Sequence, residues 1–480
     1  MRDSRKLLKI LMIAAASAGG ADVAWATDLP ARVYTKAPVP SAVFDWTGGY
    51  VGVNVGVAVG GEGNSALNIP GFPSAETFNL ASAGVLGGVQ AGYNYQFGNW
   101  VVGAEADVQG IGNEKHTNCI LTCNVVSSAT VSQDLSWFGT VRGRVGYATG
   151  PILNYFTGGF AYGGVRTSDA EVLGGAPAGS VAFNRTKTGY VLGSGLEAAI
   201  GGNWTAKIEY LYVDLGSTAD SFVLGGTPHV LNTEVRENVF RAGLNYRIGG
   251  PRTIYAAMPA ANWRGFYAGG NGGSGIARDE TVHSVAGAGL NNSLDLAPRG
   301  FIGGLQAGYN WQYGNWVYGL EGDMQGSRQI TDRSCLETCT AASIANFRQR
   351  LEWFGTARGR VGYGVGPTLF YATGGLAYGG VRTRVTENIV GLGVNGTATV
   401  DNVRAGYAAG VGIETPLEVF DWFTPGRWTV KSEYLYIDLG NSSDNYVLNG
   451  VPHTLTTNEQ NHLFRTGVNY RFDAPVAAKY

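Results

Sequence analysis

The amino-acid sequence predicts an all-β protein that consists of two tandem, antiparallel, up-and-down β-barrels of the transmembrane type, with eight strands in each barrel. Three observations lead to this fold class. The chain begins with a segment typical of exported proteins, most of the remaining sequence occurs twice, and within each copy apolar side chains alternate with small or polar ones. Alternation with a period of two residues is typical of a strand with one apolar face, and not of an amphipathic helix.

The N-terminal segment, residues 1–26, has the three parts of an export signal. Its basic part holds Arg2, Arg5, Lys6 and Lys9, its apolar part runs from Ile10 to Ala18, and Ala24-Trp25-Ala26 matches a small-x-small cleavage site. The alternative, a membrane anchor, is disfavoured because the apolar run is shorter than the roughly 18 to 20 residues that span a bilayer. We therefore expect export, cleavage near Ala26 and a periplasmic tether over residues 27–45.

The rest of the chain is an internal duplication. The segment LGGVQAGYNYQFGNWVVGAEADVQG at 86–110 returns as IGGLQAGYNWQYGNWVYGLEGDMQG at 302–326, and WFGTVRGRVGY from Trp137 returns as WFGTARGRVGY from Trp353. A fixed internal period indicates a repeated structural unit. We expect a first barrel unit at 46–248, a linker at 249–262, a second unit at 263–472 and a C-terminal tail at 473–480.

Each copy contains eight alternating runs. In the first copy their centres are Val53, Val89, Ala104, Val141, Phe160, Gly193, Ile208 and Leu244. The connections alternate between tight turns, at 98–99, 150–151 and 201–203, and long segments, at 60–83, 112–130, 167–185 and 216–236. This alternation is typical of outer-membrane barrels, which have short periplasmic turns and long outer loops.

The position of each residue in the alternation predicts which face it occupies. Around Val141, one parity is expected to face lipid (Leu135, Trp137, Val141, Val145 and Tyr147) and the other to face the barrel interior (Thr140, Arg142 and Arg144). Trp137 and Tyr147 are ten residues apart, which at ~3.3 Å per residue and ~40° of tilt separates them by roughly 25 Å along the membrane normal. That distance matches the apolar band of a barrel and its two aromatic girdles.

Two closures are compatible with sixteen strands: two eight-stranded barrels or one sixteen-stranded barrel. The tether is also duplicated, because Tyr34, Pro38 and Trp46 return in order as Tyr255, Pro259 and Trp263. One large barrel would need only a tight turn between the copies, whereas residues 249–262 could extend over roughly 45 Å. The sequence therefore favours two small barrels.

Inward-facing charges recur in both copies, with four acids and four bases in each. They are Glu105, Asp107, Arg142, Arg144, Glu197, Lys207, Glu209 and Arg241 in the first, and Glu321, Asp323, Arg358, Arg360, Glu414, Lys431, Glu433 and Arg465 in the second. Side chains fill an eight-stranded barrel, and enclosed charges are tolerated when they are paired. We predict an internal ion-pair network, in preference to a charged pore constriction or a catalytic pair of carboxylates.

The cysteines form one close pair in the second long loop of each copy, Cys119 with Cys123 and Cys335 with Cys339. An oxidising compartment favours a disulfide within each loop. A metal site would need further ligands, and His116 of the first copy is replaced by Asp332 in the second. We expect disulfides here.

Among the histidines, His229 and His453 correspond, each following a proline in the fourth long segment. For these two histidines the sequence favours a solvated turn position over a role in binding metal or haem. The sequence contains no repeated nucleophile arrangement and no nucleotide-binding loop, so we expect no enzymatic activity, cofactor or metal site. A net charge of −2 without a basic stripe argues against nucleic acid as a partner.

The segments DLPARVYTKAPVP, FDWTGGYVGVNVG, NYQFGNWVVGAEAD and NYRF resemble the small outer-membrane immunogenic or porin-family barrels of rhizobia and related bacteria. The last strand of each copy, ending at Ile248 and Phe472, also resembles the terminal assembly signal of outer-membrane barrels. The resemblance implies a surface protein that contacts outer-membrane lipid and the barrel assembly machinery, and family members are sometimes credited with binding haem or host surfaces. Members are usually single barrels of about half this length.

Three functions remain open from the sequence. The first is a structural surface protein whose barrels are filled by side chains and whose loops meet the exterior. The second is a porin-type diffusion channel for small solutes. The third is binding of haem or a host ligand through the outer loops.

Overall fold

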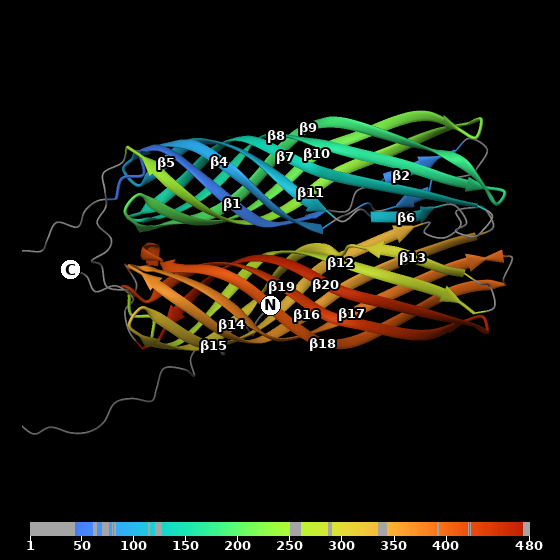
Figure 1. The fold of residues 1–480 in the computed structure, drawn as a ribbon. Helices are drawn as coiled ribbons and strands as arrows, with labels where there is room; N and C mark the ends of the chain where they lie inside the picture. Colours follow the sequence, from blue (N-terminus) through green and yellow to red (C-terminus); the bar gives the residue numbers. More distant parts are fainter. Residues whose placement is uncertain are drawn as a thin grey trace, which may run out of the picture. The chain divides into compact units, whose positions relative to one another are not determined.

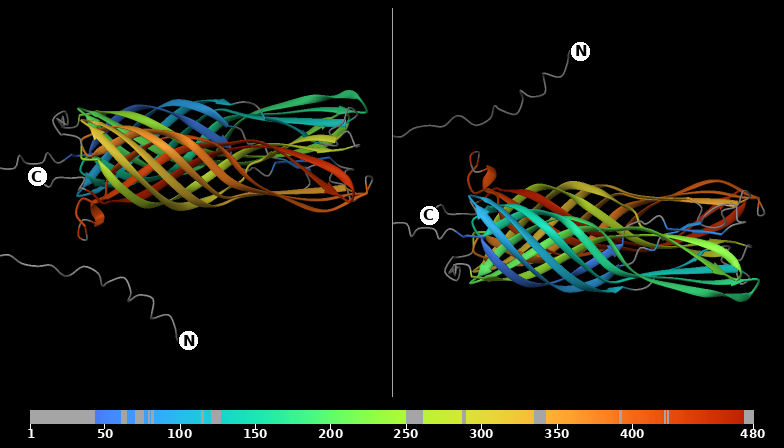
Figure 2. Two further views of the ribbon diagram at one scale, coloured as in Figure 1. Left: turned by 90° about the horizontal axis from the view of Figure 1, so that it is seen from below. Right: turned by 90° about the horizontal axis from the view of Figure 1, so that it is seen from above.

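The computed structural model describes residues 44–473, apart from 61–64, 70–75, 79, 81–82, 114–115, 121–126, 250–260, 287–289, 335–342, 391–392, 421 and 423. These residues form two antiparallel sheets, and each sheet closes on itself into a ring of eight strands (Figures 1 and 2). The predicted fold class is therefore confirmed. Among the described residues, no helix is long and apolar enough to cross a membrane.

The first ring follows chain order around the barrel. Its strands are β1 (Gly48–Gly60), β4 (Ala83–Phe97), β5 (Trp100–Asn113), β7 (Ser127–Thr149), β8 (Ile152–Leu173), β9 (Ala176–Gly201), β10 (Trp204–Leu224) and β11 (Thr227–Ile248). Three short strands, β2 (Ser65–Asn68), β3 (Glu76–Phe78) and β6 (His116–Ile120), extend the sheet at the long-loop end. The ring closes because β11 pairs with β1, from Gly49 opposite Ile248 to Gly60 opposite Glu237.

The second ring repeats this order. Its strands are β12 (Gly265–Val285), β14 (Arg299–Tyr313), β15 (Trp316–Ser334), β16 (Ser343–Val365), β17 (Thr368–Ile389), β18 (Val394–Pro416), β19 (Trp428–Leu448) and β20 (Val451–Arg471). The short strand β13 (Leu290–Leu296) pairs with β12, and a 3-10 turn, η3 (Glu418–Phe420), follows β18. Here β20 pairs with β12. Because each copy closes through its own first and last strands, the alternative of one sixteen-stranded barrel is wrong.

Two segments that the sequence predicts as long loops are mostly strand. Residues 167–185 and 216–236 form the outer halves of the β8–β9 and β10–β11 hairpins, which turn at Gly174-Gly175 and Gly225-Gly226. All four glycines have positive φ, as two-residue hairpin turns require. The prediction failed because it placed strand ends at the first polar residues, whereas the alternation continues to each pair of glycines.

The predicted faces hold for most positions, with one correction. Val141, Val145 and Tyr147 are exposed on the outer surface, and Thr140, Arg142 and Arg144 are buried inside. Leu135, predicted to face lipid, is instead 2% exposed and belongs to the apolar interior. A β-bulge between Leu135 and Trp137 causes this, because one extra residue reverses the parity on its far side.

Candidate functional site

The barrel interior of the first ring gathers charged side chains from five strands. They come from β5 (Glu105, Asp107), β7 (Arg142, Arg144), β9 (Glu197), β10 (Lys207, Glu209) and β11 (Arg241), and all eight are buried. Strand register brings opposite charges together, since Glu105 lies opposite Arg142, Lys207 opposite Glu197, and Glu209 opposite Arg241. Opposite charges on neighbouring strands stabilise that register.

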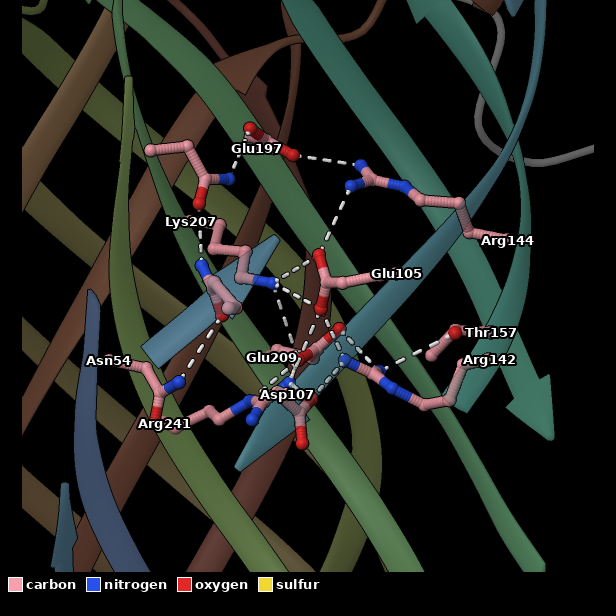
Figure 3. A network of polar contacts seen from close by, with 12 residues as sticks. Asn54, Glu105, Asp107, Arg142, Arg144, Thr157, Glu197, Lys207, Glu209 and Arg241 are labelled. Atoms are coloured by element: carbon pink, nitrogen blue, oxygen red, sulfur yellow. Dashed lines mark hydrogen bonds and ion pairs between the residues drawn. The ribbon is translucent and has the colours of Figure 1, made fainter. Parts of the chain in front are cut away.

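Arg142 lies at the centre of this network (Figure 3). Its guanidinium group contacts Glu105, lies 2.9 Å from the Asp107 carboxylate and lies 3.0 Å from that of Glu209. Glu105 and Asp107 are on the adjacent strand, whereas Glu209 is on β10, three strands away around the ring. The arginine therefore joins two sides of the barrel through its interior.

The remaining cations complete the network. Lys207 Nζ lies 2.9 Å from both oxygens of Glu105, and Arg241 Nη2 lies 2.8 Å from Asp107 and 2.6 Å from Glu209. Arg144 pairs with Glu197 at 2.8 Å. Every carboxylate of the network thus has a cation within ion-pair distance, which is the condition under which buried charges are tolerated.

The second ring repeats the arrangement with its own eight residues, all buried. Arg358 lies 2.6 Å from Glu321, 2.9 Å from Asp323 and 3.2 Å from Glu433. The other contacts are Lys431 with Glu321 at 2.8 Å, Arg465 with Asp323 at 2.8 Å and with Glu433 at 2.7 Å, and Arg360 with Glu414 at 3.0 Å. All sixteen side chains that the sequence singled out therefore lie inside the rings.

Apolar layers lie on both sides of the charges. At the short-turn end, Trp46 is 1% exposed, packs with Phe44 and Tyr155, and donates its indole N–H to the carbonyl of Gly150 at 3.0 Å. Towards the long-loop end, Phe138 and Leu211 belong to a cluster of buried apolar side chains. In the second ring, Trp263 and Phe354 take the corresponding places.

Comparison with known proteins agrees with this architecture. A family model described as an outer membrane protein beta-barrel domain matches residues 13–247 and, a second time, residues 253–472. The chain belongs to this family. The resemblance noted from the sequence is therefore confirmed, and the family motif occurs in tandem.

Two relatives of this outer membrane protein each align with less than half of its chain. The 31 kDa outer-membrane immunogenic protein of Brucella melitensis biotype 1 is 38% identical over 223 residues, which cover 44% of this chain and 87% of the relative. The 22 kDa outer membrane protein of Rhizobium leguminosarum bv. viciae is 34% identical over 182 residues, covering 38% and 70%. Among solved structures, Neisserial surface protein A matches 42% of this chain and 98% of its own at 14% identity, with a TM-score of 0.23.

Sequence reasoning missed the tyrosines that support the network of this outer membrane protein. Tyr50 donates to Glu105 at 2.7 Å, and Tyr155 donates to Glu209 at 2.9 Å. The Tyr50 ring lies directly over Gly92, where an added Cβ would come within 2.4 Å of its hydroxyl, so only glycine leaves room for it. In the second ring Tyr267, Tyr371 and Gly308 repeat these roles. Their inward parity was a signal that could have identified them.

The two corresponding histidines are not solvated, contrary to the sequence-based interpretation. His229 and His453 are each 1% exposed, because the segments that carry them are strands that point these side chains inward. His229 Nε2 lies 3.1 Å from Glu171. The predicted disulfides fall outside the residues whose side chains are described, as do the signal peptide and most of the tether, linker and tail.

Proposed function

We propose that this protein is an outer-membrane surface protein whose two barrels are closed by their own side chains and whose outer hairpins make its external contacts. The observation that carries the proposal is the buried position of Arg142 between carboxylates on β5 and β10, repeated by Arg358 in the second ring. A side chain that is paired across the lumen occupies the space that a water-filled pore would need.

Three stacked layers support closure of the first barrel. The Trp46 layer lies at one end, the ion-pair network at the centre and the Phe138 layer towards the other end. An apolar layer opposes ion passage because it gives ions nothing that replaces their hydration. A network of four acids and four bases is neutral overall, so it offers no net field for selecting cations or anions.

The proposal includes export of the chain and its division into a tether and two barrel units. Cleavage near Ala26 would leave residues 27–45 as a tether in the periplasm, ahead of barrel units at 46–248 and 263–472 joined by residues 249–262. The partners are outer-membrane lipid and the assembly machinery that inserts barrels. The relatives named as immunogenic proteins favour a role for the outer hairpins in contact with a host surface or another extracellular ligand, without enzymatic activity.

Planar-bilayer recording on the refolded full chain tests closure. We expect no stable open-channel current from the parent protein. The double variant Phe138→Ala and Phe354→Ala removes the largest side chain of the outer apolar layer in each ring, and it should show brief openings if these layers are the barrier. A large, stable current from the parent would instead establish a porin-type channel and refute the proposal.

A further inference from the structure

The long-loop end of the second ring contains a buried cluster of polar side chains. His283 on β12, Glu387 on β17 and His453 on β20 are each no more than 1% exposed. Their potential donor atoms all lie within 4.8 Å of one another. Each of the three residues lies two positions from the outer end of its strand, since β12 ends at Val285, β17 ends at Ile389 and β20 begins at Val451.

The separations between these atoms suit a metal ion. His283 Nε2 lies 3.2 Å from His453 Nδ1 and 3.3 Å from Glu387 Oε1, and His453 Nδ1 lies 3.6 Å from Glu387 Oε2. Ligands at about 2.0 to 2.1 Å from a tetrahedral Zn²⁺ are about 3.3 Å from each other. The three ligand types, two imidazoles and one carboxylate, are also a set that Zn²⁺ takes with a fourth position left over.

Tyr446 on β19 lies beside the three ligand residues. Its hydroxyl oxygen lies 2.8 Å from His283 Nε2 and 3.2 Å from Glu387 Oε1. The rings of His283, His453 and Tyr446 are nearly parallel, with interplanar angles of 11° to 12°. The rings contact one another through their polar edges, and this packing restricts their orientations before any ion arrives, which lowers the entropic cost of binding.

Apolar side chains pack against the buried cluster. Phe347 packs its ring edge-on against His283, with centroids 5.3 Å apart. Phe347 also belongs to a buried group with Leu296, Val385 and Leu455, against which Tyr446 packs. Burial of this kind strengthens the attraction between a cation and its ligands.

The first ring lacks half of this arrangement and serves as an internal reference. His229 and Glu171 correspond to His453 and Glu387, and they form a contact of 3.1 Å. However, Leu67 occupies the place of His283, because it lies opposite Leu231 as His283 lies opposite Leu455. Phe222 replaces Tyr446 and stacks on His229. Among the side chains of the first ring that the structure describes, counterparts of one imidazole and of the hydroxyl are therefore absent.

We propose that His283, Glu387 and His453 form a binding site for a divalent transition-metal ion, Zn²⁺ by geometry, at the long-loop end of the second barrel. The ion would join three separate parts of the ring, namely β12, β17 and the β19–β20 hairpin. It would thereby hold the outer hairpins of this barrel in one arrangement. This site does not depend on whether the barrels conduct.

Titration of the refolded, oxidised full chain with Co²⁺ and Zn²⁺ tests the site. We expect one ion per chain, a visible Co²⁺ absorption of tetrahedral intensity that Zn²⁺ abolishes, and a higher unfolding temperature for the second ring with Zn²⁺. His283→Leu, which copies the first ring, should weaken binding at least about 100-fold, because loss of a direct ligand exceeds the 10- to 100-fold effects of outer-shell changes.

His229→Leu is the matched control, and it should leave the stoichiometry and affinity unchanged. Heat-dependent gel mobility verifies that each variant folds, and Glu387→Gln provides a second, nearly isosteric variant that should also lose the ion. Absence of binding by the folded parent would overturn the proposal. Unchanged binding in folded His283→Leu and Glu387→Gln, or a Co²⁺ spectrum with thiolate character, would do so as well, because the ion would then lie elsewhere.

Discussion

Replacing Arg142 by alanine should strongly destabilise the first barrel. The substitution removes the cation that contacts Glu105, Asp107 and Glu209, and leaves four acids against three bases inside the ring. Loss of one partner from a buried pair costs about 3 to 5 kcal/mol. With a urea dependence of about 2 to 3 kcal/mol per molar, the unfolding midpoint of this ring should fall by roughly 1 to 2.5 M.

Hydrogen exchange in urea, followed by mass spectrometry, measures the unfolding midpoint of each ring separately in the full chain. The second ring should keep its midpoint, and Arg358→Ala should produce the mirror result, because its contacts are the same. Adding Asp107→Asn to Arg142→Ala restores equal numbers of acids and bases and should recover part of the loss. Arg382 lies on β17 and forms a surface ion pair with Asp401. As a control for Arg358→Ala, the variant Arg382→Ala should leave the urea midpoint of the second ring unchanged.

A small effect would refute the reasoning. If Arg142→Ala unfolds at the parent midpoint, water must already solvate the carboxylates, and the barrel interior would be wet rather than closed. The same result combined with a changed ion selectivity would establish Arg142 as part of a pore lining.

Three further predictions concern the rest of the chain. Residues 27–250 alone should fold in detergent and show heat-dependent gel mobility, because the first ring closes through β1 and β11; a chain that never reaches the compact form would contradict independent closure. Mass mapping of protein purified without reductant should find disulfides within the loops, Cys119–Cys123 and Cys335–Cys339, and not between the copies. Burial and the neighbouring Glu171 raise the pKa of Asp169, in the outer part of the first ring, to about 7. The folded state therefore holds an extra proton between about pH 4 and 7, and stability from this group is lost as the pH rises through that window. Asp169→Asn should flatten the dependence of the unfolding temperature on pH and raise that temperature at about pH 8; an unchanged profile would contradict this.

Strand number and the inward charges were predictable from the sequence because both depend on parity within short runs. Arg142 and Arg144 are two positions apart and flank a glycine, so their shared face follows directly from the alternation. The bulge before Trp137 was not predictable in this way, because a bulge depends on how two paired strands fit together, and this placed Leu135 on the wrong face.

The outer part of each ring was predicted less well for a different reason. The placement of His229 and His453 in a predicted loop suggested solvent exposure, yet the extended hairpins enclose an interior of their own above the membrane-spanning part. Whether a polar side chain there is solvated depends on contacts between strands distant in sequence, such as β12, β17 and β20. The pairs Gly225-Gly226 and Asn449-Gly450 were the available signal, because they place the hairpin turns far from the predicted strand ends.

Each ring closes by pairing of its own first and last strands, and this has a consequence for how such a chain can be lengthened by duplication. The contacts that seal the first barrel join residues about 190 positions apart, from Gly49 with Ile248 to Gly60 with Glu237, and none of them involves the second copy. An in-frame duplication therefore adds a complete barrel without breaking or re-registering any existing strand pair. Gene doubling in such a protein needs no compensating substitutions at the seam, and each copy is afterwards free to diverge, as the exchange of Leu67 for His283 and of Phe222 for Tyr446 illustrates.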